Sequence, residues 1–220
     1  MNTSQSSDNS LQRSPLDKIE SAVRDVWKGG IRALYRFWAG KYETTMISRF
    51  GYQAPEFIAR ALAPLMPEGS ARVLDVGCGT GLTALALLEH RTDTIDGIDF
   101  SPEMLEKARD RGIYADLHTA DVTKPLPIPN GTYDAAISSG LFTHGHVGAE
   151  AIPHVLKAIK AGGLFGFTVY WKVWERAGFA AMLENLEKAG TIEILVNEQE
   201  SHMRAIEHQK IHTVVVRHNG

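Results

Sequence analysis

The chain has 220 residues, 44% of them hydrophobic, a formal net charge of −3 at pH 7 and one cysteine. The length suits one α/β domain with an additional segment, and the charge balance favours neither a nucleic-acid nor a membrane partner, because phosphates draw on clustered Lys and Arg. With no internal disulfide and no apolar stretch near the roughly 20 residues that cross a bilayer, we expect a cytoplasmic protein.

The first part of the chain predicts a tail followed by helices. Residues 1–14 are rich in Ser, Asn and Gln, so we expect them to be disordered and to hold no secretory signal. Residues 15–70 have apolar side chains at helical spacing, interrupted by glycines at 29–30 and 51, which predicts three helices. We interpret 15–70 as a helical extension of the unit formed by 71–220.

From residue 71 onward, strand and helix patterns alternate. The strand candidates are 73–76, 94–98, 114–119, 135–139, 164–170, 191–197 and 211–217, and the helix candidates are 82–90, 102–111, 149–161 and 173–189. Nearly continuous apolar strands separated by helices indicate a parallel sheet covered on both faces. The last two strand candidates have no strong helix between them, which favours an antiparallel pair.

A glycine-rich loop follows the first of these strands. The run Gly77-Cys78-Gly79-Thr80-Gly81 leads directly into the next helix candidate. Glycine lets the main chain approach a ligand, and ligands of such sheets bind beyond the carboxyl ends of the strands. The Gly-x-Gly-x-Gly spacing differs from the Gly-x-Gly-x-x-Gly of the dinucleotide fingerprint, so NAD is disfavoured. The alternative is a tight strand-to-helix turn without a ligand.

Acidic residues accompany three successive strands. Asp75 precedes the glycine loop, and Asp99 comes 22 residues after Gly77, where a carboxylate can accept hydrogen bonds from both ribose hydroxyls. The alternative is that Asp99 supports the start of the following helix. Asp121 could accept from an exocyclic amine or close a turn. Asp96 lies inside its strand and is the weaker candidate. Three such acids together predict one nucleotide-like site.

These segments resemble the motifs of class I S-adenosylmethionine (SAM)-dependent methyltransferases. The matching segments are 74–81, 97–108, 133–135 and 160–164. A narrower similarity, to the Williams–Beuren-region methyltransferase-like proteins, rests on 37–42, 51–55, 99–105 and 112–114. The resemblance implies a Rossmann-like seven-stranded mixed sheet with helices on both faces, an N-terminal helical lid, and SAM as the cofactor.

The resemblance also implies residues that bind the two polar ends of SAM. Asp75 and the backbone of Gly77, Cys78 and Gly79 would hold the amino-acid end, and Asp99 would bind the ribose. A nucleophilic role is the alternative for Cys78, but the sequence offers it no obvious partner base.

Further matching positions surround the adenine ring. The resemblance implies that Phe100 and Met104 flank the ring, and that Asp121 and Val122 meet its amine edge. We predict no metal site, because the histidines near the carboxyl terminus lack companion ligands at metal-binding spacing.

The acceptor side lies beyond the fourth strand, where the resemblance implies that Ser138 and Leu141 line the sulfonium side. His144 is a candidate general base, with a loop histidine that has no catalytic role as the alternative. Tyr35 and Tyr42 belong to an aromatic stripe that either packs in a core or covers the cofactor, where aromatic faces attract a sulfonium. The Asn/Asp-Pro-Pro-Tyr/Phe signature of amide-nitrogen methyltransferases is absent from this segment.

The leading hypothesis is transfer of the methyl group of SAM to a small-molecule acceptor. A second hypothesis is attack on another carbon of SAM, giving aminocarboxypropyl transfer or cyclisation to azetidine-2-carboxylate, with release of methylthioadenosine. A third hypothesis is a non-catalytic SAM-binding module. The sequence leaves the acceptor and the oligomeric state open.

Overall fold

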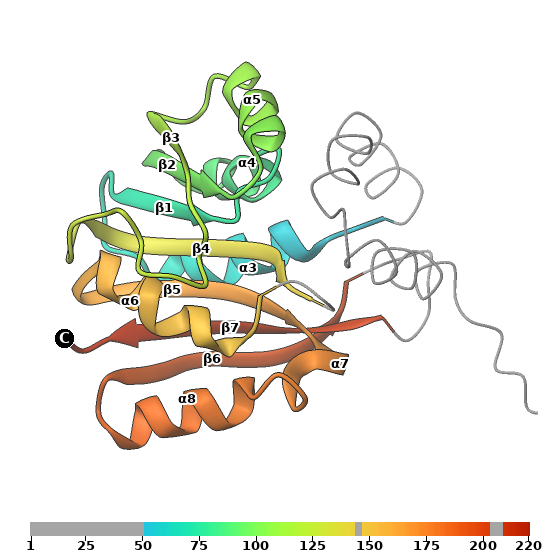
Figure 1. Ribbon diagram of the computed structural model, residues 1–220, viewed down its shortest axis with the longest axis vertical. Helices are drawn as coiled ribbons and strands as arrows, with labels where there is room; N and C mark the ends of the chain where they lie inside the picture. Colours follow the sequence, from blue (N-terminus) through green and yellow to red (C-terminus); the bar gives the residue numbers. More distant parts are fainter. Residues whose placement is uncertain (1–50, 144–146, 203–208) are drawn as a thin grey trace, which may run out of the picture.

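The computed structural model describes residues 51–143, 147–202 and 209–220. Its centre is a seven-stranded sheet in the order β3-β2-β1-β4-β5-β7-β6, which runs from top to bottom in Figure 1. The strands are β1 Arg72–Val76, β2 Thr94–Asp99, β3 Asp116–Thr119, β4 Tyr133–Phe142, β5 Ile159–Tyr170, β6 Ile192–Ser201 and β7 Lys210–His218. Strands β1 to β5 pair in parallel, and β7 runs antiparallel to both β5 and β6.

Helices lie between most of the strands. They are α3 Ala54–Leu62, α4 Leu82–Leu88, α5 Pro102–Asp110, α6 Ile152–Ala158, α7 Trp171–Trp174 and α8 Phe179–Lys188, with 3-10 turns at Ala63–Leu65 and Ala149–Ala151. The predicted mixed sheet with helices on both faces is confirmed. The two helices expected before residue 51, and the lid that they would form, lie outside the described residues. No helix in the described ranges is long and apolar enough to span a membrane.

Two apolar layers form because successive side chains of a strand point to opposite faces of the sheet. On β1, Val73 packs with α3 and α4, whereas its neighbour Leu74 packs in the layer that contains α6 and α8. The same alternation separates Leu164 from Phe165 on β5. The sheet is therefore buried on both faces, as its nearly continuous apolar strands predicted.

Helix α3 lies directly on the sheet, although the sequence placed its residues in the 15–70 extension. A Cβ added at Gly166 of β5 would lie 3.1 Å from Ile58 Cδ1 and 3.2 Å from Leu62 Cδ2. The helix also contacts α4, β4 and β7. The described end of the extension therefore belongs to the layer that covers the sheet. It starts at the carboxyl ends of the strands, and the chain runs from there along α3 to the amino end of β1.

Two predicted helices end where tertiary structure overrides local pattern. The helix expected over 149–161 stops at Ala158, because the backbone at Ile159 is extended and pairs with Tyr133 of β4. The helix expected over 173–189 is divided into α7 and α8, with Gly178 between them at a φ of +72°. Left-handed backbone of this kind favours glycine and interrupts a right-handed helix.

A pair of leucines at the end of α3 tests whether this helix is part of the folded domain. Leu62 is fully buried, whereas Leu65 exposes 40% of its surface. We expect Leu62→Ala to lower the free energy of unfolding by about 2–5 kcal/mol, because the vacated space cannot fully collapse. The control Leu65→Ala should change it by less than about 0.5 kcal/mol. Urea denaturation followed by circular dichroism measures both; two equally small changes would contradict the packing of α3.

Candidate functional site

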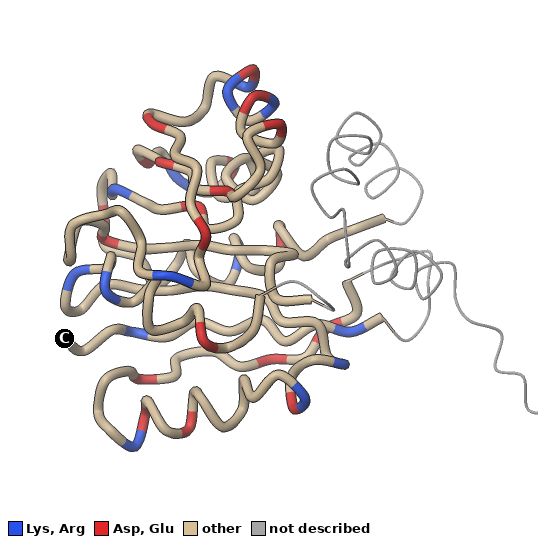
Figure 2. Tube along the Cα trace, viewed as in Figure 1, with Lys and Arg blue, Asp and Glu red and all other residues tan. Residues whose placement is uncertain are grey.

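A cavity of about 280 Å³ opens where the parallel strands β1 to β4 reach their carboxyl ends. Its lining comes from the glycine loop after β1, from the segments after β2 and β3, from the end of β4 and from the start of α3. The described lining includes two carboxylates and four hydroxyl side chains but no Lys or Arg. Elsewhere Lys and Arg are scattered among Asp and Glu (Figure 2). This setting favours a ligand that is neutral or positively charged.

The glycine loop turns sharply over the end of β1. Gly77 has a φ of +66°, and a Cβ there would lie 2.8 Å from Leu141 Cδ1, so any larger residue would collide with β4. The Cys78 amide donates to the Ile98 carbonyl at 2.9 Å, which ties the loop to β2. By contrast, a Cβ at Gly79 would meet no protein atom within 4 Å. The loop thus presents bare main chain to the cavity at Gly79.

Asp99 joins the glycine loop to the start of α5. Its Oδ2 accepts from the Gly79 amide at 2.9 Å and its Oδ1 from the Ser101 amide at 2.9 Å. Ser101 caps α5 by accepting from the Met104 amide. Asp99 lines the cavity although only 8% of it is exposed, and burial raises its pKa against the lowering effect of the two amides. Asp99 therefore supports the start of α5, as one interpretation expected, and it also lines the cavity, where its role toward the ribose stays a prediction.

The competing acid Asp96 faces another part of the molecule. Its Oδ2 accepts from Arg72 Nη2 at 2.7 Å and from the Tyr133 hydroxyl at 2.9 Å. It is fully buried and does not line the cavity. The position of Asp99 at the end of β2, beside the loop, explains the difference.

Asp75 lies beneath the glycine loop and does not line the cavity. Its Oδ2 accepts from the Tyr114 hydroxyl at 2.7 Å, while its Oδ1 is buried without a hydrogen-bond partner. Burial raises the pKa of Asp75 to about 7, and the Tyr114 hydroxyl acts in the opposite direction. Burial and the nearby carboxylates also raise the pKa of Cys78, so this residue stays a thiol and is a poor nucleophile.

The far end of the cavity combines apolar side chains with one exposed carboxylate. Phe100 is 37% exposed, whereas Met104 and Val122 are nearly buried behind it. Asp121 also lines the cavity, with its Oδ1 accepting from the Thr123 amide and hydroxyl. Its Oδ2 lies 3.2 Å from Lys124 Nζ. Asp121 therefore both closes a turn and faces the cavity. Its contacts with Thr123 and Lys124 lower its pKa.

The two serines at the end of β4 point in opposite directions. Ser138 is fully buried, donates to the Val76 carbonyl at 2.7 Å and does not line the cavity, contrary to the sequence expectation. Ser139 lines it instead, with its Oγ 2.8 Å from Thr83 Oγ1. Side chains alternate along a strand, so a shift of one residue reverses the face. Leu141 lines the cavity beyond a register irregularity in β4.

The β4 end of the cavity contains one aromatic residue, Tyr52, which the sequence groups with Tyr35, Trp38 and Tyr42 as either core packing or a cofactor cover. Tyr52 lines the cavity, and a Cβ at Gly140 would lie 2.9 Å from its hydroxyl. Gly140 lies one residue past the strand predicted over 135–139 but inside the observed β4, where a glycine can mark such a close approach. The candidates His144, Tyr35 and Tyr42 lie outside the described residues.

Comparison with known proteins identifies one sequence family. Residues 73–163 match a family described as methyltransferase domain. Methyltransferase-like protein 27 from Homo sapiens is 36% identical over 168 residues, which cover 74% of this chain and 68% of that protein. The 18S rRNA (guanine-N(7))-methyltransferase bud23 of Schizosaccharomyces pombe is 37% identical over 101 residues, or 46% of this chain and 37% of that protein.

Solved structures share the fold at lower identity. The S-adenosylmethionine-dependent methyltransferase from Mesorhizobium loti has a TM-score of 0.55 and 21% identity, and the match covers 72% of this chain and 96% of that one. The [4+2]-cyclase SpnF has a TM-score of 0.58 and 23% identity, with 74% and 81% coverage. Proteins named for different activities therefore share this architecture.

The burial of Asp75 predicts how stability depends on pH. Its folded-state pKa of about 7 lies above the ordinary value of 3.8, so its ionisation as pH rises from about 4 to 7 weakens the fold. Asp75→Asn accepts from Tyr114 but never ionises. We expect its free energy of unfolding to rise relative to the native protein between pH 5 and 8, by about 4 kcal/mol at most.

Urea denaturation at several pH values measures this difference. The matched control is Asp121→Asn, whose carboxyl titrates below this range because its pKa is lowered. The difference in the free energy of unfolding between Asp121→Asn and the native protein should stay constant from pH 5 to 8. A constant difference for Asp75→Asn as well would contradict the raised pKa of Asp75.

Proposed function

The chain belongs to the class I SAM-dependent methyltransferases, and from this premise we propose that it transfers the methyl group of SAM to a small-molecule acceptor. The observation that carries the proposal is the cavity itself, which joins the glycine loop and Asp99 to a hydroxyl-lined end at β4. SAM supplies, when bound, a methyl group on a sulfonium sulfur that a nucleophile can displace directly.

The described residues fit SAM. Asp99 directs a nearly buried carboxylate to the cavity, and each of its oxygens keeps a lone pair beyond the amide bond that it already accepts. In our proposal it accepts the ribose hydroxyls. The main chain of Gly77, Cys78 and Gly79, which is bare at Gly79, holds the amino-acid end with the charge of Asp75 beneath it.

The adenine ring fits the apolar end of the cavity. Phe100 and Met104 flank the ring, and Val122 contributes its side chain to the same surface. Asp121 has one oxygen directed to Thr123 and one to Lys124, and its exposed carboxylate still accepts from an amine at the cavity edge. The ring is thereby removed from water on its apolar faces.

The opposite end of the cavity would receive the acceptor. Thr83, Ser139 and Tyr52 bring hydroxyl groups there, and Leu141 and Val147 bring apolar surface. Hydroxyls that donate and accept can orient a small nucleophile, and the apolar walls exclude water from the reacting atoms. In this proposal Ser139 takes the place expected for Ser138, while Leu141 keeps its expected place.

A small molecule suits this site better than RNA. Relatives named as 18S rRNA methyltransferases show that nucleic-acid substrates occur among similar proteins. Over residues 51–220, however, Asp and Glu outnumber Lys and Arg, and binding to a nucleic-acid backbone depends on basic side chains. The described part of the cavity also offers no Lys or Arg to a phosphate.

The test is methyl transfer from SAM that carries tritium in its methyl group. Purified protein is incubated either with a metabolite extract filtered to remove macromolecules or with ribosomal RNA, and the nucleoside product is separated by chromatography. Label in the small-molecule fraction together with S-adenosylhomocysteine supports the proposal. Label in the RNA, release of methylthioadenosine, or no turnover by a protein that binds SAM would each overturn it.

Two aspartates that share the cavity but differ in burial give a sharper prediction. Asp99→Asn should weaken SAM binding by about tenfold or more, because a hydrogen bond to a charged, buried group is lost. Asp121→Asn should weaken it by less than about threefold, because the Asp121 side chain is 47% exposed. Isothermal titration calorimetry measures both affinities, and equal losses would refute the assigned difference.

A further inference from the structure

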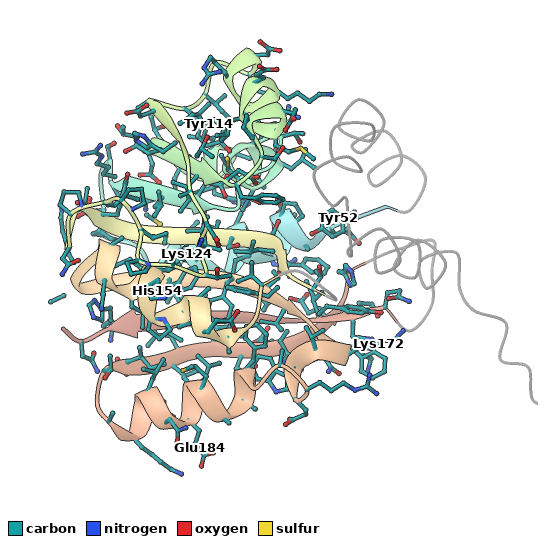
Figure 3. All side chains as sticks on the ribbon, in the orientation of Figure 1. Tyr52, Tyr114, Lys124, His154, Lys172 and Glu184 are labelled. Atoms are coloured by element: carbon teal, nitrogen blue, oxygen red, sulfur yellow. The ribbon has the colours of Figure 1, made fainter. Side chains whose placement is uncertain are left out.

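Tyr114 occupies the short segment between α5 and β3 and reaches beneath the glycine loop. Helix α5 ends at Asp110 and β3 begins at Asp116, so Tyr114, expected at the start of a strand over 114–119, lies outside the observed strand. Figure 3 labels Tyr114 among the elements α4, α5 and β3, away from Tyr52 at the start of α3. Its hydroxyl donates to Asp75 Oδ2 at 2.7 Å. It does not line the cavity.

Two glycines make room for the Tyr114 ring. A Cβ at Gly81, the last residue of the glycine loop, would lie 3.2 Å from the Tyr114 hydroxyl oxygen. A Cβ at Gly97 of β2 would lie 3.0 Å from Tyr114 Cε1. The positive φ of Gly81 explains that glycine on backbone grounds, but Gly97 lies in a regular strand. Its missing side chain is explained by the space that three side chains occupy together, because the same Cβ would also lie 2.7 Å from Leu117 Cδ2 and 3.0 Å from Cys78 Sγ.

The two carboxylate oxygens of Asp75 differ in their hydrogen bonding. The Tyr114 hydroxyl occupies Oδ2, whereas Oδ1 is buried without a hydrogen-bond partner beside the first turn of α4. A buried carboxylate oxygen without a donor costs free energy in the absence of a ligand. The backbone N–H of Ala84 acts on the carboxylate from this side and lowers its pKa together with the Tyr114 hydroxyl. The negative charge that remains lies beneath the loop, where it attracts a positively charged group on a ligand.

We propose that Tyr114 is a positioning residue for the cofactor, which acts through Asp75 on the amino-acid end of SAM. By holding Oδ2, the phenol fixes the carboxylate beneath the loop and directs its remaining charge to the α-ammonium group. The proposal rests on the proposed function, because that function assigns the loop to the amino-acid end. Tyr114 itself touches neither the cofactor nor the acceptor.

The same contact predicts the pH dependence of cofactor binding. The groups that face Asp75 are Tyr114, Asp99 and Cys78, with Arg111 beyond the Tyr114 ring. Asp99 raises the pKa of Asp75, and the Tyr114 hydroxyl lowers it. Removing the hydroxyl therefore raises this pKa further, so less Asp75 is ionised near pH 7. The affinity for a ligand with an α-ammonium group should rise with pH as Asp75 ionises, and without the hydroxyl this rise should occur at a higher pH.

The experiment compares two ligands that differ in the amino-acid end. S-adenosylhomocysteine carries the α-ammonium group and methylthioadenosine lacks it. Calorimetry measures both between pH 6.0 and 7.5, where this group keeps its proton, because even the α-amino group of a peptide titrates only at about 7.7–8.0. We expect Tyr114→Phe to weaken the binding of S-adenosylhomocysteine about tenfold at pH 6.5, and the binding of methylthioadenosine by less than about twofold. The pH at which the affinity for S-adenosylhomocysteine rises should be higher in the variant than in the native protein.

The chain offers a matched control for the lost hydroxyl. Tyr133 is also buried and donates to a buried carboxylate, Asp96 Oδ2, at 2.9 Å, but both residues lie away from the cavity. Tyr133→Phe should leave both affinities unchanged. Because Tyr114 acts through Asp75, the double variant Asp75→Asn/Tyr114→Phe should bind S-adenosylhomocysteine no more weakly than Asp75→Asn alone.

The outcomes separate this inference from the proposed function. Equal losses for the two ligands would overturn it and leave Tyr114 as support for the loop only, as would additive losses in the double variant. An unchanged affinity in a folded Tyr114→Phe protein, checked by its thermal unfolding, would also overturn it. If the native protein binds neither ligand, the proposed function fails as well.

Discussion

The carboxylate of Asp99 accepts one backbone N–H from the glycine loop, at Gly79, and one from the start of α5, at Ser101. These two segments follow neighbouring parallel strands, and the single side chain that bridges them shapes the floor of the cavity. Burial makes the bridge strong, because hydrogen bonds to a charged acceptor are less screened away from water. The site is thus formed by the protein's own contacts before any ligand contributes.

Three carboxylates at this edge of the sheet have different surroundings and hence different properties. Asp75 and Asp99 are buried and have raised pKa values, whereas Asp121 is exposed, bound by Thr123 and Lys124, and has a lowered pKa. Lys124 partly compensates Asp121, but the described cavity lining itself holds no Lys or Arg. A cofactor that carries both an ammonium and a sulfonium group suits this electrostatic setting better than a pyrophosphate does.

The fold determines the cofactor end of the site more firmly than the acceptor end. The [4+2]-cyclase SpnF and the Mesorhizobium loti methyltransferase share this architecture, so the architecture alone does not select a reaction. The cofactor end is built from loops that directly follow β1, β2 and β3. The acceptor end depends on the irregular end of β4 and on Tyr52 near the start of α3, where small changes of sequence alter the surface.

The sequence by itself determined the sheet and its glycine loop, because a buried strand, a glycine turn and a helix start are each local patterns. It also favoured Asp99 over Asp96, and Asp99 is the one of the two that lines the cavity, since a residue at the end of its strand can reach the loop. Tertiary structure decided what depends on distant partners: the end of α6, where Ile159 joins the sheet, and the side of β4 that faces the cavity. It likewise decided the place of Tyr114, which meets Asp75 across 39 residues of chain. No spacing rule connects two such residues, because their contact exists only after β1, β2 and α4 have packed around the ring.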